Sequence, residues 1–438
     1  MLEVIGIIAF FLIIVASIAL HEIGHLVPAK AFGVKVTEYM VGFGPTLWSR
    51  RKGETTYGLK AIPVGGYIRM VGMLPPPKDA PEGTARSLTT GRVGTFVQQA
   101  REQALEEIEP GDENRVFYKL PVAKRVIIML AGPFMNLVIA FVLFAGVLVG
   151  IGLPEPTTQV NSVVACAPST TNPAGTATPD GACPDGPTPA AAAGLQAGDV
   201  ITRFASVAVS DWEELSGLIR AAPPGPVAIA IERGGIEQTL TVDLIDITRP
   251  VVDEAGRDTG ETVTTAFLGV RPDFIYVSQP LSSVPAEMWN LTERSAVALV
   301  GLPVRLYELV TDTLIGGEER SIDSPVSVVG ASRLGGDIVA SGESGPAKIA
   351  IFLSLAASLN LFLFLFNLLP ILPLDGGHVA GALYEGLRRR VARIRGRPDP
   401  GPVDVARMLP VAYVMAMVLI VVGGVVIFAD LVRPLSLF

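Results

Sequence analysis

The chain has 438 residues, half of them hydrophobic and only 17% charged, with a formal net charge of −8 at pH 7. The mean hydropathy of +0.49 and the low charged share exclude an ordinary soluble globular protein. The acidic balance gives no indication of nucleic-acid binding.

The excess of apolar residues gathers in four runs, each close to the roughly 20 residues that cross a hydrocarbon core of about 30 Å. A buried helix of a soluble protein rarely stays apolar on every face for so long. We therefore predict a polytopic α-helical membrane protein with four transmembrane helices, built on Val4–Leu20, Val126–Leu148, Ile349–Leu369 and Leu409–Ile427.

The first run also has to be weighed against a cleaved signal peptide. Its start, Met1-Leu2-Glu3, lacks the basic residues of a signal sequence, and no small-x-small cleavage site leads into a polar segment. The run continues instead into His21-Glu22-Ile23-Gly24-His25. We expect a span that is retained.

Residues 33–73 alternate between apolar and polar side chains, and glycine and proline interrupt the alternation at Gly42–Pro45 and Pro63–Gly66. This pattern predicts a small antiparallel sheet rather than a helix. The residues that follow are rich in proline and then charged, with a helix expected near Val97–Ile108.

The distribution of basic residues predicts the orientation. Lysine and arginine gather between the first two runs and again at Arg388–Arg397, whereas the long segment after the second run has no lysine before Lys348. Because basic loops stay on the cytoplasmic side, we expect both termini to face outward and the acidic segment to be extracytoplasmic. Its two cysteines, Cys166 and Cys183, are compatible with a disulfide or with two free thiols in a loop.

Within this outer segment, a low-complexity stretch at Thr157–Pro189 precedes a helix at Asp211–Arg220 and strands at Val227–Glu232 and Thr239–Asp246. The pattern predicts a small α+β or β domain. The sequence Gly194-Leu195-x-x-Gly198-Asp199-x-Ile201 resembles PDZ domains of bacterial membrane proteases. The resemblance implies a PDZ-like α+β domain that binds extended peptides or C-termini; a spacer that only excludes bulky substrates is the alternative.

The pattern His21-Glu22-x-x-His25 lies at the inner end of the first run. On a helix the two imidazoles share a face and can bind one metal ion, and Glu22 is free to act as general base. Ionisable groups at membrane depth are costly and usually functional. A tetrahedral zinc ion with an open position needs a third protein ligand, and Asp375 at the inner end of the third run provides it, with His378 as the rival.

Together with Asn367-x-x-Pro370 and Leu374-Asp375-Gly376, these residues closely resemble the site-2 protease family of intramembrane metalloproteases, as do Pro63–Tyr67 and Ala131-Gly132-Pro133-x-x-Asn136. The resemblance covers nearly the whole chain, and its single PDZ domain points to the actinobacterial branch. It implies a Zn²⁺ cofactor on His21, His25 and Asp375, catalysis by Glu22, and a membrane-associated β element. It also implies single-span substrates such as anti-sigma factors or remnant signal peptides in a bacterial cell membrane.

Substrate binding is expected from Asn367, Pro370, Gly66 and Tyr67, because a cleaved helix must be unwound and its freed backbone needs hydrogen-bond partners. Two rival functions stay open: a membrane zinc transporter, and an inactive scaffold that binds membrane proteins.

The predicted segments are 1–32, first span; 33–73, β region; 74–125, cytoplasmic loop; 126–150, second span; 151–265, PDZ domain with its insert; 266–345, amphipathic linker; 346–378, third span; 379–407, basic cytoplasmic loop; and 408–431, fourth span.

Overall fold

A computed structural model of the chain describes residues 1–75, 108–168, 182–252, 258–318, 320–321, 323–403 and 405–435. These residues form two compact units. Unit 1 comprises Met1–Ile151 and Gln279–Phe438, and unit 2 is Gly152–Ser278. Each unit is described on its own. The helix expected near Val97–Ile108 lies almost wholly outside the described residues.

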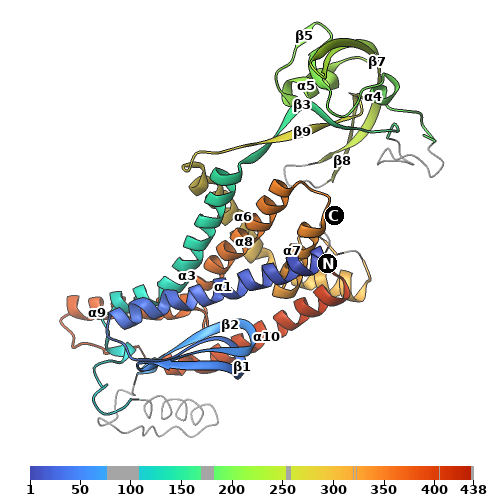
Figure 1. The fold of residues 1–438 in the computed structure, drawn as a ribbon. Helices are drawn as coiled ribbons and strands as arrows, with labels where there is room; N and C mark the ends of the chain where they lie inside the picture. Colours follow the sequence, from blue (N-terminus) through green and yellow to red (C-terminus); the bar gives the residue numbers. More distant parts are fainter. Residues whose placement is uncertain are drawn as a thin grey trace. The chain divides into compact units, whose positions relative to one another are not determined.

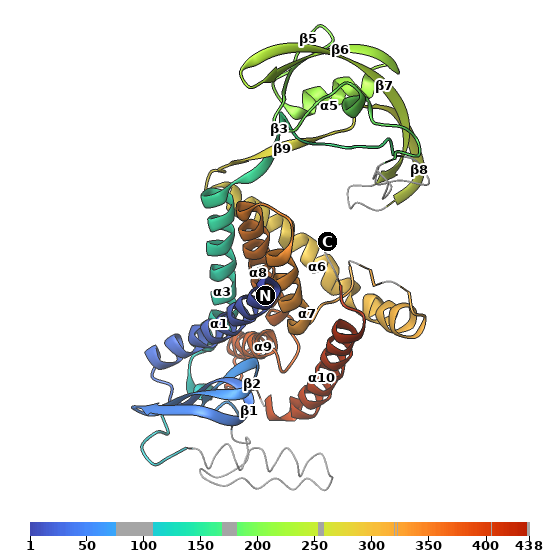
Figure 2. The ribbon, with the colours of Figure 1, turned by 45° about the vertical axis from the view of Figure 1, so that its right-hand side comes forward.

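Four helices in the described part of unit 1 are long and apolar enough to cross a membrane, which confirms the four predicted spans. Side chains such as Ile420 are 70% exposed, as expected for helices whose apolar faces meet lipid rather than water. Helices α1, α3 and α8 contact one another, as Figures 1 and 2 show. The spans are α1 (Leu2–Ala31), α3 (Val122–Ala145) with its π-helical continuation η2 (Gly146–Ile151), α8 (Gly345–Asn367) and α10 (Leu409–Val432).

Small residues let α1 approach its neighbours closely. A Cβ atom on Gly24 would collide with the backbone of Ala131 and Gly132 in α3. Near the other end of α1, a Cβ on Gly6 would lie 2.6 Å from the carbonyl oxygen of Gly335 in α7 (Val328–Ala340). Contacts this close are how helices associate in lipid, where the hydrophobic effect cannot drive them together. Helix α1 is thereby held between two partners.

The predicted β region is present as two long strands, β1 (Val36–Lys52) and β2 (Thr55–Met70). Residues 38–41 pair with 66–69 on one side and with 56–59 on the other, so the two strands build a four-segment sheet. Residues 66–69 have no second strand partner in the described sheet. The sheet is fixed to α1 by the Tyr39 hydroxyl, which donates to the Ala19 carbonyl at 2.8 Å. It therefore offers a free edge beside α1.

The segment predicted as an amphipathic linker, 266–345, is divided between the two units. Its first residues complete the sheet of unit 2. Most of its remaining length is helical, beginning with α6 (Ser283–Glu308) and the π-helical η3 (Leu309–Ile315). Met288 of α6 packs with Phe144 of α3 and Leu361 of α8. The segment is thus a packed part of unit 1 rather than a linker.

The predicted boundaries of the third span and the following loop are also wrong. Helix α8 ends at Asn367, and a new helix, α9 (Asp375–Ile394), begins at the aspartate that was placed within the span. Pro370 and Pro373 stand between the two helices, and each proline lacks the backbone N–H group of a helix and crowds the preceding turn with its ring, which favours a break here. Most of the predicted basic loop 379–407 is therefore helical. Short 3₁₀ turns lead into α3 and α10: η1 (Phe117–Lys119) and η4 (Val405–Met408).

Unit 2 extends to Ser278, beyond the predicted boundary at 265, because its last strand returns to pair with its first. The sheet order is β8-β7-β6-β4-β3-β9, with β5 paired to β4. The helix and the two strands predicted here are confirmed as α5, β6 and β7. The elements are β3 (Leu153–Val163), α4 (Pro189–Ala192), β4 (Val200–Phe204), β5 (Val207–Ala208), α5 (Trp212–Ala221), β6 (Gly225–Arg233), β7 (Ile236–Val252), β8 (Asp258–Phe267) and β9 (Val270–Val277).

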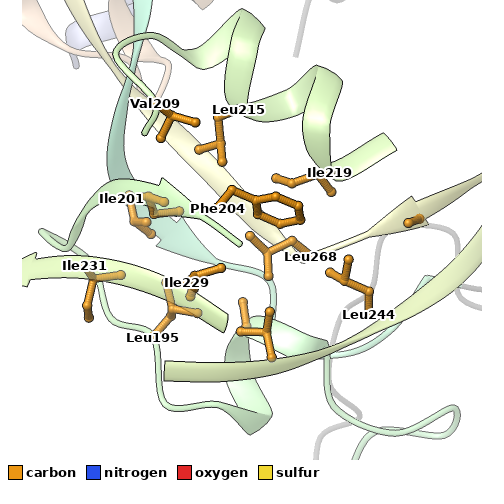
Figure 3. Close-up of a cluster of buried hydrophobic side chains, with 14 residues drawn as sticks. Leu195, Ile201, Phe204, Val209, Leu215, Ile219, Ile229, Ile231, Leu244 and Leu268 are labelled. Carbon is orange, nitrogen blue, oxygen red and sulfur yellow. The ribbon is translucent and has the colours of Figure 1, made fainter. Parts of the chain in front are cut away.

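A hydrophobic core of its own holds unit 2 together. Leu215 and Ile219 of α5 pack with Phe204 and Leu268, as Figure 3 shows. The motif residue Asp199 is buried, accepts two hydrogen bonds from Arg233 at 2.7 Å, and caps the turn through the Gln196 amide. The Arg233 guanidinium holds the pKa of Asp199 below its usual value.

The cysteines of unit 2 form a disulfide, Cys166–Cys183. The sequence was compatible with a disulfide or with two free thiols, and the structure contains the disulfide.

Candidate metal centre

The two histidines of the His-Glu-x-x-His pattern lie on one face of an unbroken stretch of α1. Their Nε2 atoms are 3.2 Å apart, and their rings meet edge to face with centroids 4.9 Å apart. Because positions i and i+4 of a helix lie one turn apart on the same side, the backbone alone brings the two imidazoles together.

Asp375 completes a triangle of ligand atoms. Its Oδ2 atom lies 3.3 Å from the Nε2 atom of His21 and 3.3 Å from that of His25. Zinc binds such atoms at about 2.0–2.1 Å, and a tetrahedral arrangement then separates any two ligand atoms by about 3.3 Å. The three distances in the protein match that value, so the residues fit a zinc ion with one position left for water.

The outer nitrogen of His25 is held by the backbone. Its Nδ1 atom lies 2.8 Å from the carbonyl oxygen of Ile128, which accepts only from a protonated nitrogen. The hydrogen is therefore on Nδ1, and the lone pair of Nε2 points toward Asp375. Metal-binding histidines are commonly oriented in this way.

Asn136 of α3 performs the same task for His21. Its Nδ2 atom lies 3.2 Å from Nδ1 of His21, while its Oδ1 atom is buried without a hydrogen-bond partner. The oxygen and nitrogen of an amide occupy nearly the same space. A half-turn of the Asn136 amide brings Oδ1 to the ring, where it accepts the Nδ1 hydrogen and leaves Nε2 of His21 free for the metal. The unpartnered oxygen thus fits a bound zinc ion.

Glu22 lies beside the three ligand atoms but is not one of the converging group. It is 8% exposed, and the backbone of Gly66 packs against it so closely that a Cβ there would lie 2.9 Å from its Cγ. The sheet therefore covers this carboxylate while leaving it in contact with the cavity. A carboxylate in this place can exchange a proton with a molecule bound at the ligand triangle.

The ligand triangle opens into a cavity of about 300 Å³. One wall comes from α1, another from the free edge of the sheet, and a third from the segment between α8 and α9. The lining residues are His21, Glu22, His25, Gly66, Tyr67, Ile68, Met70, Met73, Met129, Asn367, Pro373, Leu374, Asp375 and His378.

Most residues predicted for the site meet in this cavity, including Gly66, Tyr67 and Asn367. Pro370 does not line it, and Pro373 does. His378, the rival ligand, lines the cavity but is not part of the group whose ligand atoms converge. Asn136 was not among the residues predicted for the site. An amide inside an otherwise apolar run was the signal that would have found it.

The chain matches the model of peptidase family M50 over residues 9–398. It is 36% identical to the zinc metalloprotease Rip1 of Mycobacterium tuberculosis over 448 residues, with the full length of both chains covered. It is 37% identical to the zinc metalloprotease Rip1 of Mycolicibacterium smegmatis, with 99% of each chain covered. The metalloprotease MmpA of Caulobacter vibrioides is 28% identical, over 86% of this chain and 85% of its own.

The role of Asn136 can be tested by zinc affinity. We expect Asn136→Leu to weaken zinc binding about 10- to 100-fold, because His21 loses the acceptor that fixes its tautomer. Asn136→Asp keeps an acceptor oxygen and should stay within a few-fold of the original protein. Titration against a competing chelator measures both.

Asn360→Leu is the matched control, because Asn360 is also a buried amide, in α8, and bonds Ser17 rather than a metal ligand. It should leave zinc affinity unchanged. Equal affinities in Asn136→Leu and Asn360→Leu would remove the assignment of Asn136.

Proposed function

The chain belongs to peptidase family M50 and is a multi-pass membrane zinc metalloprotease, and from that premise we propose that the cavity at α1 and α9 hydrolyses peptide bonds of single-span membrane proteins at bilayer depth. The observation that carries the proposal is the ligand triangle of His21, His25 and Asp375, whose ligand atoms lie 3.2–3.3 Å from one another. Glu22 lies beside this triangle and is not one of its ligands. A transporter would not need that carboxylate, and an inactive scaffold would need none of the four.

We assign the metal to His21, His25 and Asp375. Bound there, zinc supplies a Lewis acid that lowers the pKa of a water molecule toward about 7. Glu22 removes a proton from the attacking water and delivers it to the leaving amine, because it borders the cavity without being drawn into the ligand triangle. The cover of Gly66 over Glu22 keeps bulk solvent away from this proton transfer.

The substrate backbone is bound by the free edge of the sheet. Among the described residues, 66–69 have a strand partner on one side only, and Gly66, Tyr67 and Ile68 line the cavity. An extended segment can add to such an edge through main-chain hydrogen bonds. Asn367 lies in the same cavity and offers an amide to a carbonyl or N–H group of the unwound substrate. Pro370 acts indirectly, by ending α8.

We propose that unit 2 is a PDZ-like domain that controls access from the outer side. The chain leaves unit 1 at Ile151, which by helical rise is about 22 Å along the helix from Asn136 at the metal centre. A cavity of about 200 Å³ between α5 and residues 266–270 offers a place for a peptide, with Trp212 and Arg220 among its lining residues. Substrates of the anti-sigma-factor type, already trimmed outside the membrane, suit this arrangement.

The catalytic role of Glu22 is tested by Glu22→Gln. The variant keeps every metal ligand but loses the base, so cleavage of a model single-span substrate should fall at least about 100-fold. Zinc content, measured by elemental analysis, should stay at the level of the original protein.

Two variants complete this experiment. Asp375→Ala should lose both zinc and activity, whereas His378→Ala should retain zinc. Substantial turnover by Glu22→Gln would move the base elsewhere, and full zinc occupancy in Asp375→Ala would give the third-ligand role to His378.

The gating role of unit 2 is tested by replacing it. Leu153 pairs with Val277, so a short Gly-Ser linker can join Ile151 directly to Gln279. We expect the shortened protein to cut a trimmed substrate within about twofold of the original rate, and to gain cleavage of a substrate with a bulky outer domain. If zinc is retained but neither substrate is cut, unit 2 is needed for catalysis and the gating proposal fails.

The orientation of the chain is proposed from charge: the arginines of α9 lie on the cytoplasmic side and unit 2 on the outer side. Cysteines introduced at Glu237 and Arg395, both exposed, can be labelled on intact cells with a membrane-impermeant maleimide. We expect labelling at position 237 and none at 395 until the cells are opened. The reverse pattern would invert the topology.

A further inference from the structure

Helix α9 carries an apolar stripe that nothing in the described structure covers. Leu383, Tyr384 and Leu387 are 56–61% exposed, and Ile394 is 76% exposed. At 100° per residue, these four and Val391 fall within about 100° of the helix circumference. The opposite face, with Ala382 and Glu385, is buried against the rest of unit 1. Helix α9 therefore packs on the protein with one face and leaves its apolar face open to something other than the described residues.

Arginines border the stripe. Arg390 lies next to one edge of it and Arg388 next to the other. Arg388 is engaged by the carbonyls of Pro400 and Gly401. Four others are exposed and have no ion-pair partner among the described residues: Arg390, Arg393, Arg395 and Arg397.

A buried ion pair fixes where α9 lies along the spans. Glu385 accepts from both terminal nitrogens of Arg125, from Arg389 at 3.1 Å and from the Val403 amide at 2.9 Å. Arg125 directly precedes the apolar run that starts at Val126, so it marks the level at which α3 leaves the hydrocarbon. The middle of α9 is therefore at the border between lipid tails and headgroups.

An apolar stripe at this level, with unpaired Arg390 along one edge and further exposed arginines at the C-terminal end of the helix, matches a helix that lies in the membrane surface. We propose that α9 docks on the bilayer leaflet beside the inner end of α3, with the stripe among the acyl chains and Arg390, Arg393 and Arg397 on anionic phospholipid headgroups. Charge complementarity and continuity with the span favour lipid over a protein partner. Each arginine then shifts the docking equilibrium about fivefold.

The test uses the full-length protein, one copy per nanodisc, with a spin label on Leu387→Cys. The native cysteines are disulfide-bonded and do not compete for the label. We expect the label to collide with oxygen, which dissolves in lipid, rather than with a water-soluble nickel chelate. This preference should be severalfold stronger in discs of phosphatidylcholine and phosphatidylglycerol than in phosphatidylcholine alone. A label on Glu237→Cys in unit 2 should respond to the chelate in both.

Charge variants distinguish docking of α9 on anionic lipid from burial of α9 against protein. Joint replacement of Arg390, Arg393 and Arg397 by glutamate should abolish the effect of the anionic lipid, and replacement by lysine should retain it. Glu385 and Arg125 are untouched, and unchanged zinc content reports that the fold persists. A label open to the chelate in both discs, closed to both reagents, or indifferent to the glutamate substitutions would overturn the proposal; the second result would indicate a protein contact instead.

Discussion

Everything at the metal centre depends on bringing three ligand atoms within 3.3 Å of one another at membrane depth. The two histidines need only a helix, but Asp375 comes from the far end of the chain. Polar groups in lipid must find partners inside the protein, so each of the two histidines is held by a second group: His25 by the Ile128 carbonyl and His21 by Asn136. Both belong to α3, which thereby becomes the template for the site.

The close contact between α1 and α3 makes this template possible. Gly24 lies against Ala131 and Gly132, and a Cβ on Gly132 would occupy the space of the His25 ring. Larger residues at these positions would separate the helices and move the imidazoles away from Ile128 and Asn136. Asp375 reaches the histidines because the chain leaves the helical path at residues 368–374. Gly376 and Gly377 follow this break and pack directly on its backbone, where a Cβ atom would collide. The break points the start of α9 at the metal site.

The sequence was sufficient for the parts of the fold that rest on local physics. Runs of apolar residues predicted the four spans, helical spacing predicted the shared face of His21 and His25, and matching depth brought Asp375 to them. It was insufficient where tertiary contacts decide. Residues 38–41 pair with two different segments, and the alternation of apolar and polar residues does not predict this double pairing. Nor could spacing show that 266–345 divides between two units, because β9 ends in unit 2 through pairing with β3.

The position of Asp375 also explains why α8 ends at Asn367 and not at residue 378, the predicted end of the third segment. A helix continuing from α8 would carry Asp375 along the bilayer normal, away from the histidines of α1. Ending α8 at Asn367 lets the chain turn, place Asp375 at the ligand triangle and run on as a helix whose Glu385 meets Arg125. Because Arg125 lies in the first turn of the helix that also holds Asn136, α3 positions both parts of the site: the imidazoles through its middle, and the carboxylate through the ion pair with Glu385 of α9.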